Sequence, residues 1–164
     1  MRMLSSALCI RDATVADLPQ VLTLMQALAR FEGYIEAFAV DIEALRSRAF
    51  GPDAQCHIQV AEAAGMVQGY AVTLPIAFTY DLRPTLVLKE LYVNPAYRSA
   101  GVGAQLLKAI AGRALTDGAG RLRWDVLAGN NRAEQFYQRH GGKAVEKWRA
   151  YEMDANSLHR LASG

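Results

Sequence analysis

Residues 97–107 combine glycines with small residues in a pattern that can hold a phosphate group. Arg98, Gly101 and Gly103 form an Arg-x-x-Gly-x-Gly motif between an apolar run at 86–93 and a long amphipathic stretch. Glycines let the backbone approach a ligand closely, and the first N–H groups of a helix have no partner within the helix. Because these donors and the helix dipole favour an anion, the motif predicts a phosphate-binding strand–turn–helix unit.

The motif differs from two common nucleotide-binding loops. A dinucleotide fold places Gly-x-Gly-x-x-Gly in its first strand–turn–helix unit, whereas this turn lies past the middle of the chain and lacks the third glycine. The sequence also contains no Gly-x-x-x-x-Gly-Lys-Ser/Thr loop. Taken alone, the motif is equally compatible with any tight strand-to-helix turn, so its context decides the interpretation.

Segments on both sides of the turn supply that context. Residues 91–98 read Leu-Tyr-Val-Asn-Pro-Ala-Tyr-Arg, and Asn130 is followed at 136–141 by Phe-Tyr-Gln-Arg-His-Gly. With these motifs the chain resembles the GNAT superfamily of N-acetyltransferases from about Ile10 to Asp154. Further segments at 10–14, 29–32, 77–81 and 148–149 are most similar to its spermidine/spermine and thialysine branch. The resemblance implies acetyl-CoA as co-substrate and direct attack by a primary amine (a diamine, polyamine, thialysine or amino-acid-like molecule) in a ternary complex. No metal is expected, because the sequence has no His-x-x-x-His or Cys-x-x-Cys pattern.

The resemblance also implies which residues contact the cofactor. The amides of loop 99–104 would hold the pyrophosphate, and the backbone of the fourth strand would pair with the pantetheine amides as an added strand does. A bulge in that strand would direct one N–H at the thioester oxygen. Asn130 matches an asparagine near the cofactor and is equally suited to cap a helix. The implied cofactor contacts are Leu91, Tyr92, Val93, Arg98, Ser99, Ala100, Gly101, Val102, Gly103, Ala104, Asn130, Arg132, Ala133 and Tyr137.

Two side chains have the acid–base chemistry that acetyl transfer requires. Tyr137 matches the tyrosine that protonates the departing thiolate in the family, and its ordinary pKa of about 10 is close to that of an alkyl thiol. Packing of this ring against the sheet is the alternative. Glu90 shares a face with Leu88 and Tyr92 if the strand alternates, and burial would raise its pKa toward that of a useful base. A water chain acting as the base and a structural salt bridge remain open alternatives for Glu90.

Acidic side chains are candidates for holding a cationic acceptor. Glu32 and Glu146 match substrate-contacting positions of the branch, and Phe31, next to Glu32, is a further candidate for contact with the substrate. Asp125, in the expected fifth strand, is a third candidate. Solvated surface acids are the alternative for each of them.

The fourth strand departs from the polyamine acetyltransferases in one respect. Those enzymes carry consecutive acids where this chain has Lys89 and Glu90. A lysine at a cation-binding face repels a dication, which disfavours spermidine and spermine. Smaller or zwitterionic amines remain compatible with the sequence.

Two other functions are weighed against a small-molecule acetyltransferase. A protein or peptide N-acetyltransferase would favour an open groove, against which the acids Glu32 and Glu146 argue. A non-catalytic acyl-CoA-binding module would need neither Tyr137 nor Glu90.

The length of 164 residues predicts a single domain over residues 1–164, with 1–7 and 162–164 as ragged termini. The order of the expected strands and helices makes this domain α/β. Combined with the resemblance, this is the GNAT fold: a mixed, mostly antiparallel sheet, splayed between strands 4 and 5 and flanked by helices. Strands are expected at 8–13, 56–63, 66–75, 86–93, 121–127, 143–147 and 149–154, and helices from 14 to about 29 and at 41–50, 102–116 and 130–140, with a helical tail to 161.

The composition is that of an ordinary soluble α/β enzyme, with 52% hydrophobic and 21% charged residues and a net charge of +2. Scattered basic residues and the lack of an apolar run near 20 residues argue against nucleic acid and membrane partners. Cys9 and Cys56 are expected to be buried free thiols, as fits a cytoplasmic protein. The resemblance implies a homodimer.

Overall fold

The computed structural model describes residues 7–164, which form two compact units that divide between Leu127 and Ala128. The first unit contains, in chain order, β1 (Cys9–Asp12), η1 (Val15–Asp17), α1 (Leu18–Glu32), η2 (Ile35–Ala37), α2 (Ile42–Ala49), β2 (His57–Ala63), β3 (Met66–Ile76), β4 (Thr85–Val93), η3 (Pro95–Ala100), α3 (Val102–Thr116) and β5 (Arg121–Arg123). The second unit contains α4 (Asn131–Arg139) and α5 (Ala155–Ser163). Each unit is described by itself.

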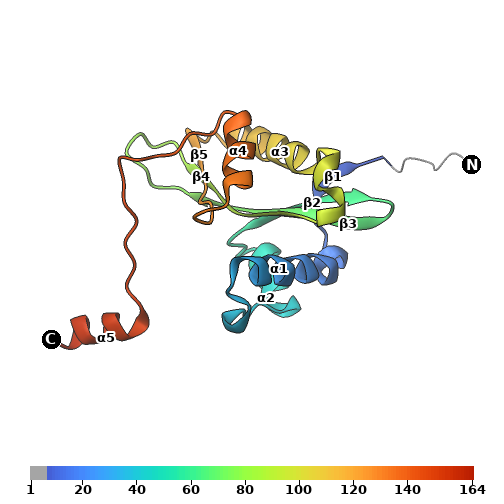
Figure 1. Cartoon of the computed structure of the whole chain (residues 1–164). Coiled ribbons are helices and arrows are strands. Elements are labelled where there is room, and N and C mark those ends of the chain that lie inside the picture. Colours follow the sequence, from blue (N-terminus) through green and yellow to red (C-terminus); the bar gives the residue numbers. More distant parts are fainter. Residues whose placement is uncertain (1–6) are drawn as a thin grey trace, which may run out of the picture. The chain divides into compact units, whose positions relative to one another are not determined.

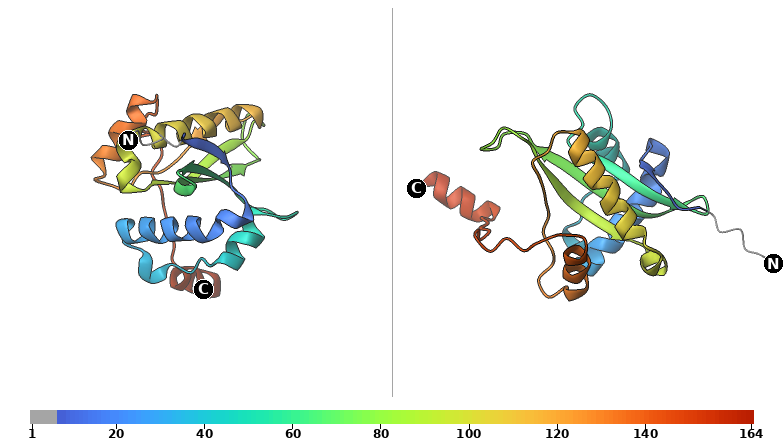
Figure 2. Two further views of the ribbon diagram at one scale, coloured as in Figure 1. Left: turned by 90° about the vertical axis from the view of Figure 1, so that its right-hand side faces the viewer. Right: turned by 90° about the horizontal axis from the view of Figure 1, so that it is seen from above.

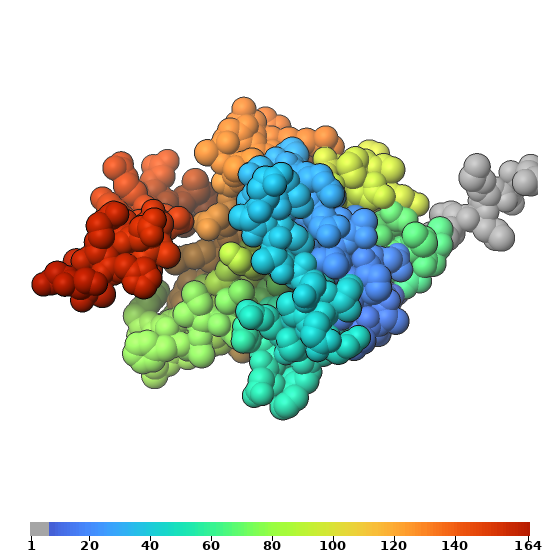
Figure 3. All heavy atoms as spheres, turned by 90° about the horizontal axis from the view of Figure 1, so that it is seen from below, coloured from blue at the N-terminus to red at the C-terminus, as the bar shows by residue number. Residues whose placement is uncertain are grey.

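One five-stranded sheet forms the centre of the first unit, in the order β1-β2-β3-β4-β5. Its first four strands are antiparallel neighbours, and β5 runs parallel to β4. Helix α3 covers one face of the sheet, and α1 with α2 covers the other (Figure 1, Figure 2). Figure 3 shows the face formed by α1 and α2, in blue to cyan. The mixed sheet flanked by helices confirms the predicted fold.

Helix α1 is held to the sheet by the apolar face that its periodicity predicts. Leu18, Val21, Met25 and Leu28 are buried in one core with Ile58, Val60, Val67, Tyr70, Val72 and Tyr92 of the strands. The predicted pairing of Thr14 with Asp17 is present before this helix, since the Asp17 carboxylate accepts a hydrogen bond from the Thr14 N–H at 2.7 Å.

Strands β4 and β5 pair over only three residues and then part. The paired positions are Thr85 with Arg121, Leu86 with Leu122, and Val87 with Arg123. Strand β5 therefore ends at Arg123, and the prediction of a strand to Leu127 is wrong. A strand persists only where its backbone groups find a partner, and the pairing of β4 with β5 ends at Val87 and Arg123. The resulting gap is the splay that the resemblance implies.

The second unit differs most from the sequence prediction. No strand is present over 143–147 or 149–154, so both of these predicted strands are wrong. Within this unit, no neighbouring strand is described that could satisfy their backbone groups. The predicted helical tail is confirmed as α5.

Both thiols are free, as predicted, but Cys9 is exposed and Cys56 is only partly buried. The predicted burial is therefore wrong for Cys9. In the part of the chain that the structure describes, no helix is long and apolar enough to cross a bilayer.

Candidate active site

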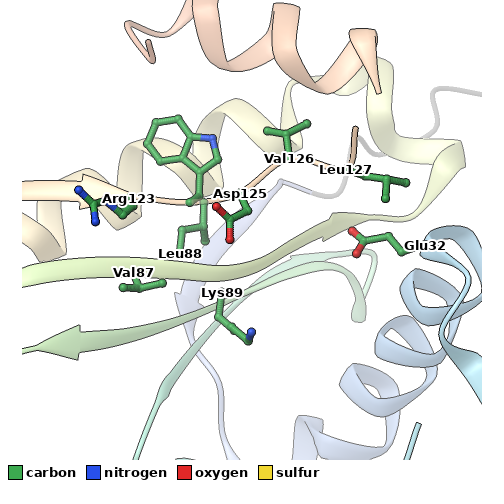
Figure 4. Close-up of a pocket in the computed structure, with 9 residues that line it drawn as sticks. Glu32, Val87, Leu88, Lys89, Arg123, Asp125, Val126 and Leu127 are labelled. Carbon is green, nitrogen blue, oxygen red and sulfur yellow. The ribbon is translucent and has the colours of Figure 1, made fainter. Parts of the chain in front are cut away.

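A pocket of about 380 Å³ lies where β4 and β5 part. It is lined by Val87, Leu88 and Lys89 of β4, by Glu32 at the end of α1, and by Arg123, Trp124, Asp125, Val126 and Leu127. The carboxylates of Glu32 and Asp125 both point toward the space beside β4 (Figure 4). The structure thus brings together two of the predicted substrate acids. Phe31 is 57% exposed and does not line this pocket.

A bulge in β4 determines which side chains reach the pocket. Glu90 pairs with Val72 and Leu88 pairs with Thr73, so the register shifts by one residue and Lys89 has no partner on β3. The alternation therefore reverses at Lys89. Glu90 shares a face with Tyr92, as predicted, but Leu88 lies on the opposite face, so that part of the prediction is wrong. Lys89 and Val87 leave β4 on the α1 side, whereas Leu88 leaves it on the other side (Figure 4).

Glu90 is bound to a fully buried tyrosine. The Tyr70 hydroxyl donates a hydrogen bond to the Glu90 carboxylate over 3.1 Å, and Tyr70 has no exposed surface. Burial raises the pKa of Glu90 above its ordinary value, while the Tyr70 hydrogen bond and the Lys89 charge act in the opposite direction. Among the described residues, the Glu90 carboxylate has no ion-pair partner, so the salt-bridge interpretation has no support.

Several proton-bearing groups respond to the charge on Glu90. Burial and then the Glu90 carboxylate raise the pKa values of Tyr34, Cys56 and Tyr70. Glu32 also contributes to the raised pKa of Glu90. Glu90 is therefore the centre of a partly buried, acidic cluster next to the pocket.

The glycine turn lies at the other end of β4. Asn94 caps η3, because its side-chain oxygen accepts a hydrogen bond from the Ala96 N–H at 3.2 Å. Gly101 has φ of +76°, which joins η3 to α3 and is strained for residues with a side chain. No side chain caps α3, and Ser99, Ala100 and Gly101 are exposed, so the first amides of the helix are available to an anion.

Arg98 holds this turn against the strand. Its Nε donates to the Val93 carbonyl over 3.0 Å, and its guanidinium lies 5.3 Å from the centre of the Tyr92 ring. These contacts give Arg98 a positioning role in addition to the cofactor contact that the resemblance implies.

The predicted site residues beyond Leu127 all lie in the second unit. Asn130 caps α4, since its side chain accepts a hydrogen bond from the Ala133 N–H at 3.2 Å, which confirms the predicted cap. Arg132 is exposed in the first turn of this helix. The half-buried Tyr137 contacts Phe136 edge to face, with ring centroids 5.1 Å apart. Glu146 lies exposed in the segment between the two helices.

Two tyrosines that interact with Glu90, Tyr70 and Tyr34, are not among the site residues predicted from the sequence. Tyr70 is one of two tyrosines paired across β3 and β4, the other being Tyr92. A tyrosine inside an apolar strand needs a partner for its hydroxyl, and Glu90 was the available acceptor. That signal was present in the sequence, whereas the position of Tyr34 depends on how the chain turns after α1.

The sequence profile of the acetyltransferase (GNAT) family matches residues 21–142. The chain belongs to this family. A relative from Sus scrofa, described as thialysine N-epsilon-acetyltransferase, is 30% identical over 168 aligned positions, which cover 96% of this chain and 98% of the relative. It supports the predicted branch.

Solved structures show the same fold. An integron cassette protein from the mobile metagenome of V. cholerae superposes with a TM-score of 0.79 at 23% identity, covering 96% of this chain and 98% of that one. Aminoglycoside N-acetyltransferase AAC(6')-Iy in complex with CoA gives a TM-score of 0.76 at 19% identity, covering 93% of this chain and 99% of that one.

As a GNAT protein, the chain is an acetyl-CoA-dependent acetyltransferase, and its own residues fit that co-substrate. Leu91 and Val93 lie in the part of β4 that has β3 on one side and, among residues 7–164, no strand paired on the other. The free edge suits the amides of a pantetheine arm, and the glycine turn follows directly along the chain. In the described residues, no group of His, Cys, Asp and Glu side chains has an arrangement suited to a metal ion.

Replacing Gly101 with alanine is expected to weaken CoA binding about tenfold. A Cβ at Gly101 would meet no atom within 4 Å, so the cost comes from the positive φ, which is about 1–2 kcal/mol for a residue with a side chain. The turn relieves this strain by shifting, which displaces the amides that would hold the phosphates. Isothermal titration calorimetry with CoA measures the change.

Gly112→Ala is the matched control. Gly112 lies within α3, has ordinary φ, and a Cβ there would also meet no atom within 4 Å. Its CoA affinity is expected to equal that of the unaltered protein. Equal affinity of the Gly101→Ala variant would remove the turn from phosphate binding.

Proposed function

We propose that this chain transfers an acetyl group from acetyl-CoA to a primary amine of a small molecule. The observation that carries the proposal is the acid-containing pocket between the diverging ends of β4 and β5. Glu32 and Asp125 line it, and the buried Glu90 follows a lining residue directly. A carboxylate in such a pocket can hold an ammonium group through a charge-assisted hydrogen bond. The relative named thialysine N-epsilon-acetyltransferase supports an acceptor of this kind.

Two side chains are assigned to the proton transfers. An amine attacks only when it is neutral, so a base has to accept the proton that the ammonium loses. Glu90 has the raised pKa and the single tyrosine partner that suit this role. Tyr137 would donate a proton to the sulfur as its bond to the acetyl carbon breaks, and this role follows from its match to the family motif.

The backbone provides the remaining chemistry. Acetyl-CoA supplies the activated acetyl group when it is bound. The bulge at Lys89 interrupts the ladder between β3 and β4, and a backbone N–H freed there would stabilise negative charge on the acetyl oxygen. The Ser99–Ala104 amides, with Asn130, Arg132 and Ala133, would hold the rest of the co-substrate.

An acceptor panel tests the proposed function. The protein is incubated with acetyl-CoA and diamines, polyamines, amino acids or peptides, and the released thiol is recorded against a buffer blank. Release that depends on small amines is expected. Release with peptides alone would support a protein acetyltransferase, and no release above the blank would support a non-catalytic module.

Removing the Tyr70 hydroxyl is expected to shift the pH profile of this reaction. The hydrogen bond from Tyr70 favours the ionised form of Glu90, so Tyr70→Phe raises the pKa of Glu90 further. Glu90 accepts a proton only when it is ionised, so the acidic limb of the kcat/KM profile moves to higher pH. An unchanged limb would separate Glu90 from the titration that limits the rate.

Two further properties expected from the sequence are proposed with this function. We expect a homodimer and a cytoplasmic location. Light scattering after size-exclusion chromatography measures the mass of the assembly, and a monomer at all concentrations would contradict the first expectation.

A further inference from the structure

Strand β3 contains an extra residue at Gln68. The register between β2 and β3 shifts between Val67 and Gly69, which leaves Gln68 without a partner on β2 among the described residues. The burial pattern shows the same shift. Val67 and Tyr70 both lie in the core that α1 covers, although residues three apart in a regular strand point to opposite faces. Gln68 is therefore the bulged residue of β3.

Gln68 is bonded instead to the residue that follows β4. Its side chain is only 8% exposed, and the side-chain oxygen accepts a hydrogen bond from the Asn94 amide nitrogen Nδ2 at 3.1 Å. The Gln68 carbonyl accepts a second hydrogen bond, from the Asn94 backbone N–H, at 2.7 Å. A buried amide costs free energy unless it is hydrogen-bonded, so this pair fixes Asn94 against β3.

Asn94 connects this bond to the glycine turn. Its side-chain oxygen caps η3 through the Ala96 N–H, and its carbonyl accepts a hydrogen bond from the Tyr97 N–H at 2.8 Å. One side-chain amide therefore bonds in two directions, with its NH₂ group to β3 and its oxygen to η3. Helix η3 leads directly to Gly101 and the first amides of α3.

The other end of the turn depends on the residue next to Gln68. A Cβ at Gly69 would lie 3.3 Å from Cδ1 of Leu106 on α3 and 3.1 Å from the Tyr92 carbonyl oxygen. Gly69 therefore allows α3 to pack close to β3. Two consecutive residues of β3 thus determine where the turn begins and where α3 lies.

We infer that Gln68 is a positioning residue for the phosphates of acetyl-CoA, acting through Asn94 on the glycine turn. The inference rests on the proposed function, in which the Ser99–Ala104 amides hold these phosphates, and it adds a residue from another strand to that site. Backbone donors bind an anion best when their directions are fixed beforehand, because ordering a loop on binding costs affinity. The bonds between Gln68 and Asn94 fix the start of the turn in this way.

Gln68→Met is expected to weaken CoA binding about fivefold, the equivalent of one net hydrogen bond, as measured by isothermal titration calorimetry. Methionine keeps the size of the side chain, but its sulfur is a weak acceptor for the Asn94 amide. Asn94→Ser breaks the same link from the other side, because a serine hydroxyl can cap η3 but is too short to reach Gln68. Asn94 is half-buried, so this variant tests the link even if Gln68→Met fails to fold.

A double variant and a truncated donor distinguish positioning from general damage. If both residues act through one link, the double variant binds CoA no more weakly than either single variant. Acetylpantetheine carries the acetyl thioester but no diphosphate. Its KM is expected to stay unchanged in Gln68→Met, whereas the KM for acetyl-CoA rises with little change in kcat. Damage to the fold would affect both donors alike.

Gln59→Met is the matched control. Gln59 is a partly buried glutamine of β2, and its side-chain oxygen has no hydrogen-bond partner among the residues that the structure describes. Its replacement breaks no link to the turn, so the CoA affinity is expected to equal that of the unaltered protein. Thermal melting checks that each variant is folded.

The outcomes separate this inference from the proposed function. Normal CoA affinity in the folded variants, additive losses in the double variant, or equal losses with acetyl-CoA and acetylpantetheine would each overturn the role of Gln68 while the acetyltransferase function stands. Calorimetry needs no acceptor, so weaker CoA binding by the variants supports the inference even if no small amine is acetylated. Absence of CoA binding by the unaltered protein overturns both.

Discussion

Replacing Glu90 with glutamine is expected to lower kcat by about 10²-fold or more, which is the usual contribution of a general base. Glutamine keeps the size of the side chain and an oxygen to accept the Tyr70 hydrogen bond, but it has no basic site for the proton of the amine. The remaining activity should lose its acidic limb. In the unaltered protein that limb lies above the ordinary pKa of a glutamate, because burial raises the pKa of Glu90.

Stability distinguishes loss of the base from loss of the fold. A carboxyl whose folded pKa is raised destabilises the protein as pH increases from its unfolded pKa through its folded pKa, and the full cost is present above both. At neutral pH, Glu90→Gln removes this cost, so its melting temperature should be equal or higher. Glu43→Gln, which removes only an exposed ion pair with Arg46 on α2, is the control with unchanged rate and little change in stability. A Glu90→Gln variant with normal kcat would assign proton removal to a water chain.

The sequence predicts the framework of the first unit because its signals are local. Helix α3 begins and ends where predicted, at Val102 and Thr116, since a glycine precedes it and its apolar residues recur at helical spacing. The short helix after Asp41 is also confirmed, with the Asp41 carboxylate accepting from the Ala44 N–H. Capping and periodicity need no knowledge of distant residues.

The candidate site depends on distant pairing, and there the sequence predicts less. Alternation placed Glu90 with Tyr92 correctly but with Leu88 wrongly, because the bulge at Lys89 is a property of the β3–β4 register. The same shift makes Lys89 a pocket residue, which strand alternation alone does not predict. A register is determined by two strands together, so one strand read alone does not reveal it.

The length of β5 depends on its neighbour in the same way. Residues 121–127 have the composition of a strand, but the segment pairs with β4 only as far as Arg123, opposite Val87. The residues that fail to continue the strand, 124–127, are the ones that line the pocket. The error in predicting the strand and the presence of the site therefore have one cause.

Tyr137→Phe is expected to lower kcat by about 10²-fold or more while leaving KM for acetyl-CoA nearly unchanged. The change removes one hydroxyl and keeps the aromatic ring, so the edge-to-face contact with Phe136 at 5.1 Å is preserved. Without the hydroxyl, the sulfur has to leave as a thiolate, and the free energy of the transition state rises. A single-turnover measurement is needed to show that chemistry limits the observed rate.

Tyr151→Phe is the matched control for Tyr137, since Tyr151 is a tyrosine of the same unit that is 92% exposed. Its kcat is expected to equal that of the unaltered protein. If Tyr137→Phe also retains a normal kcat with chemistry limiting, its hydroxyl does not protonate the leaving thiolate, and the ring serves packing. A fall in kcat together with a large rise in KM would instead indicate that the hydroxyl binds the co-substrate in its ground state, because a proton donor acts only as the sulfur charge develops.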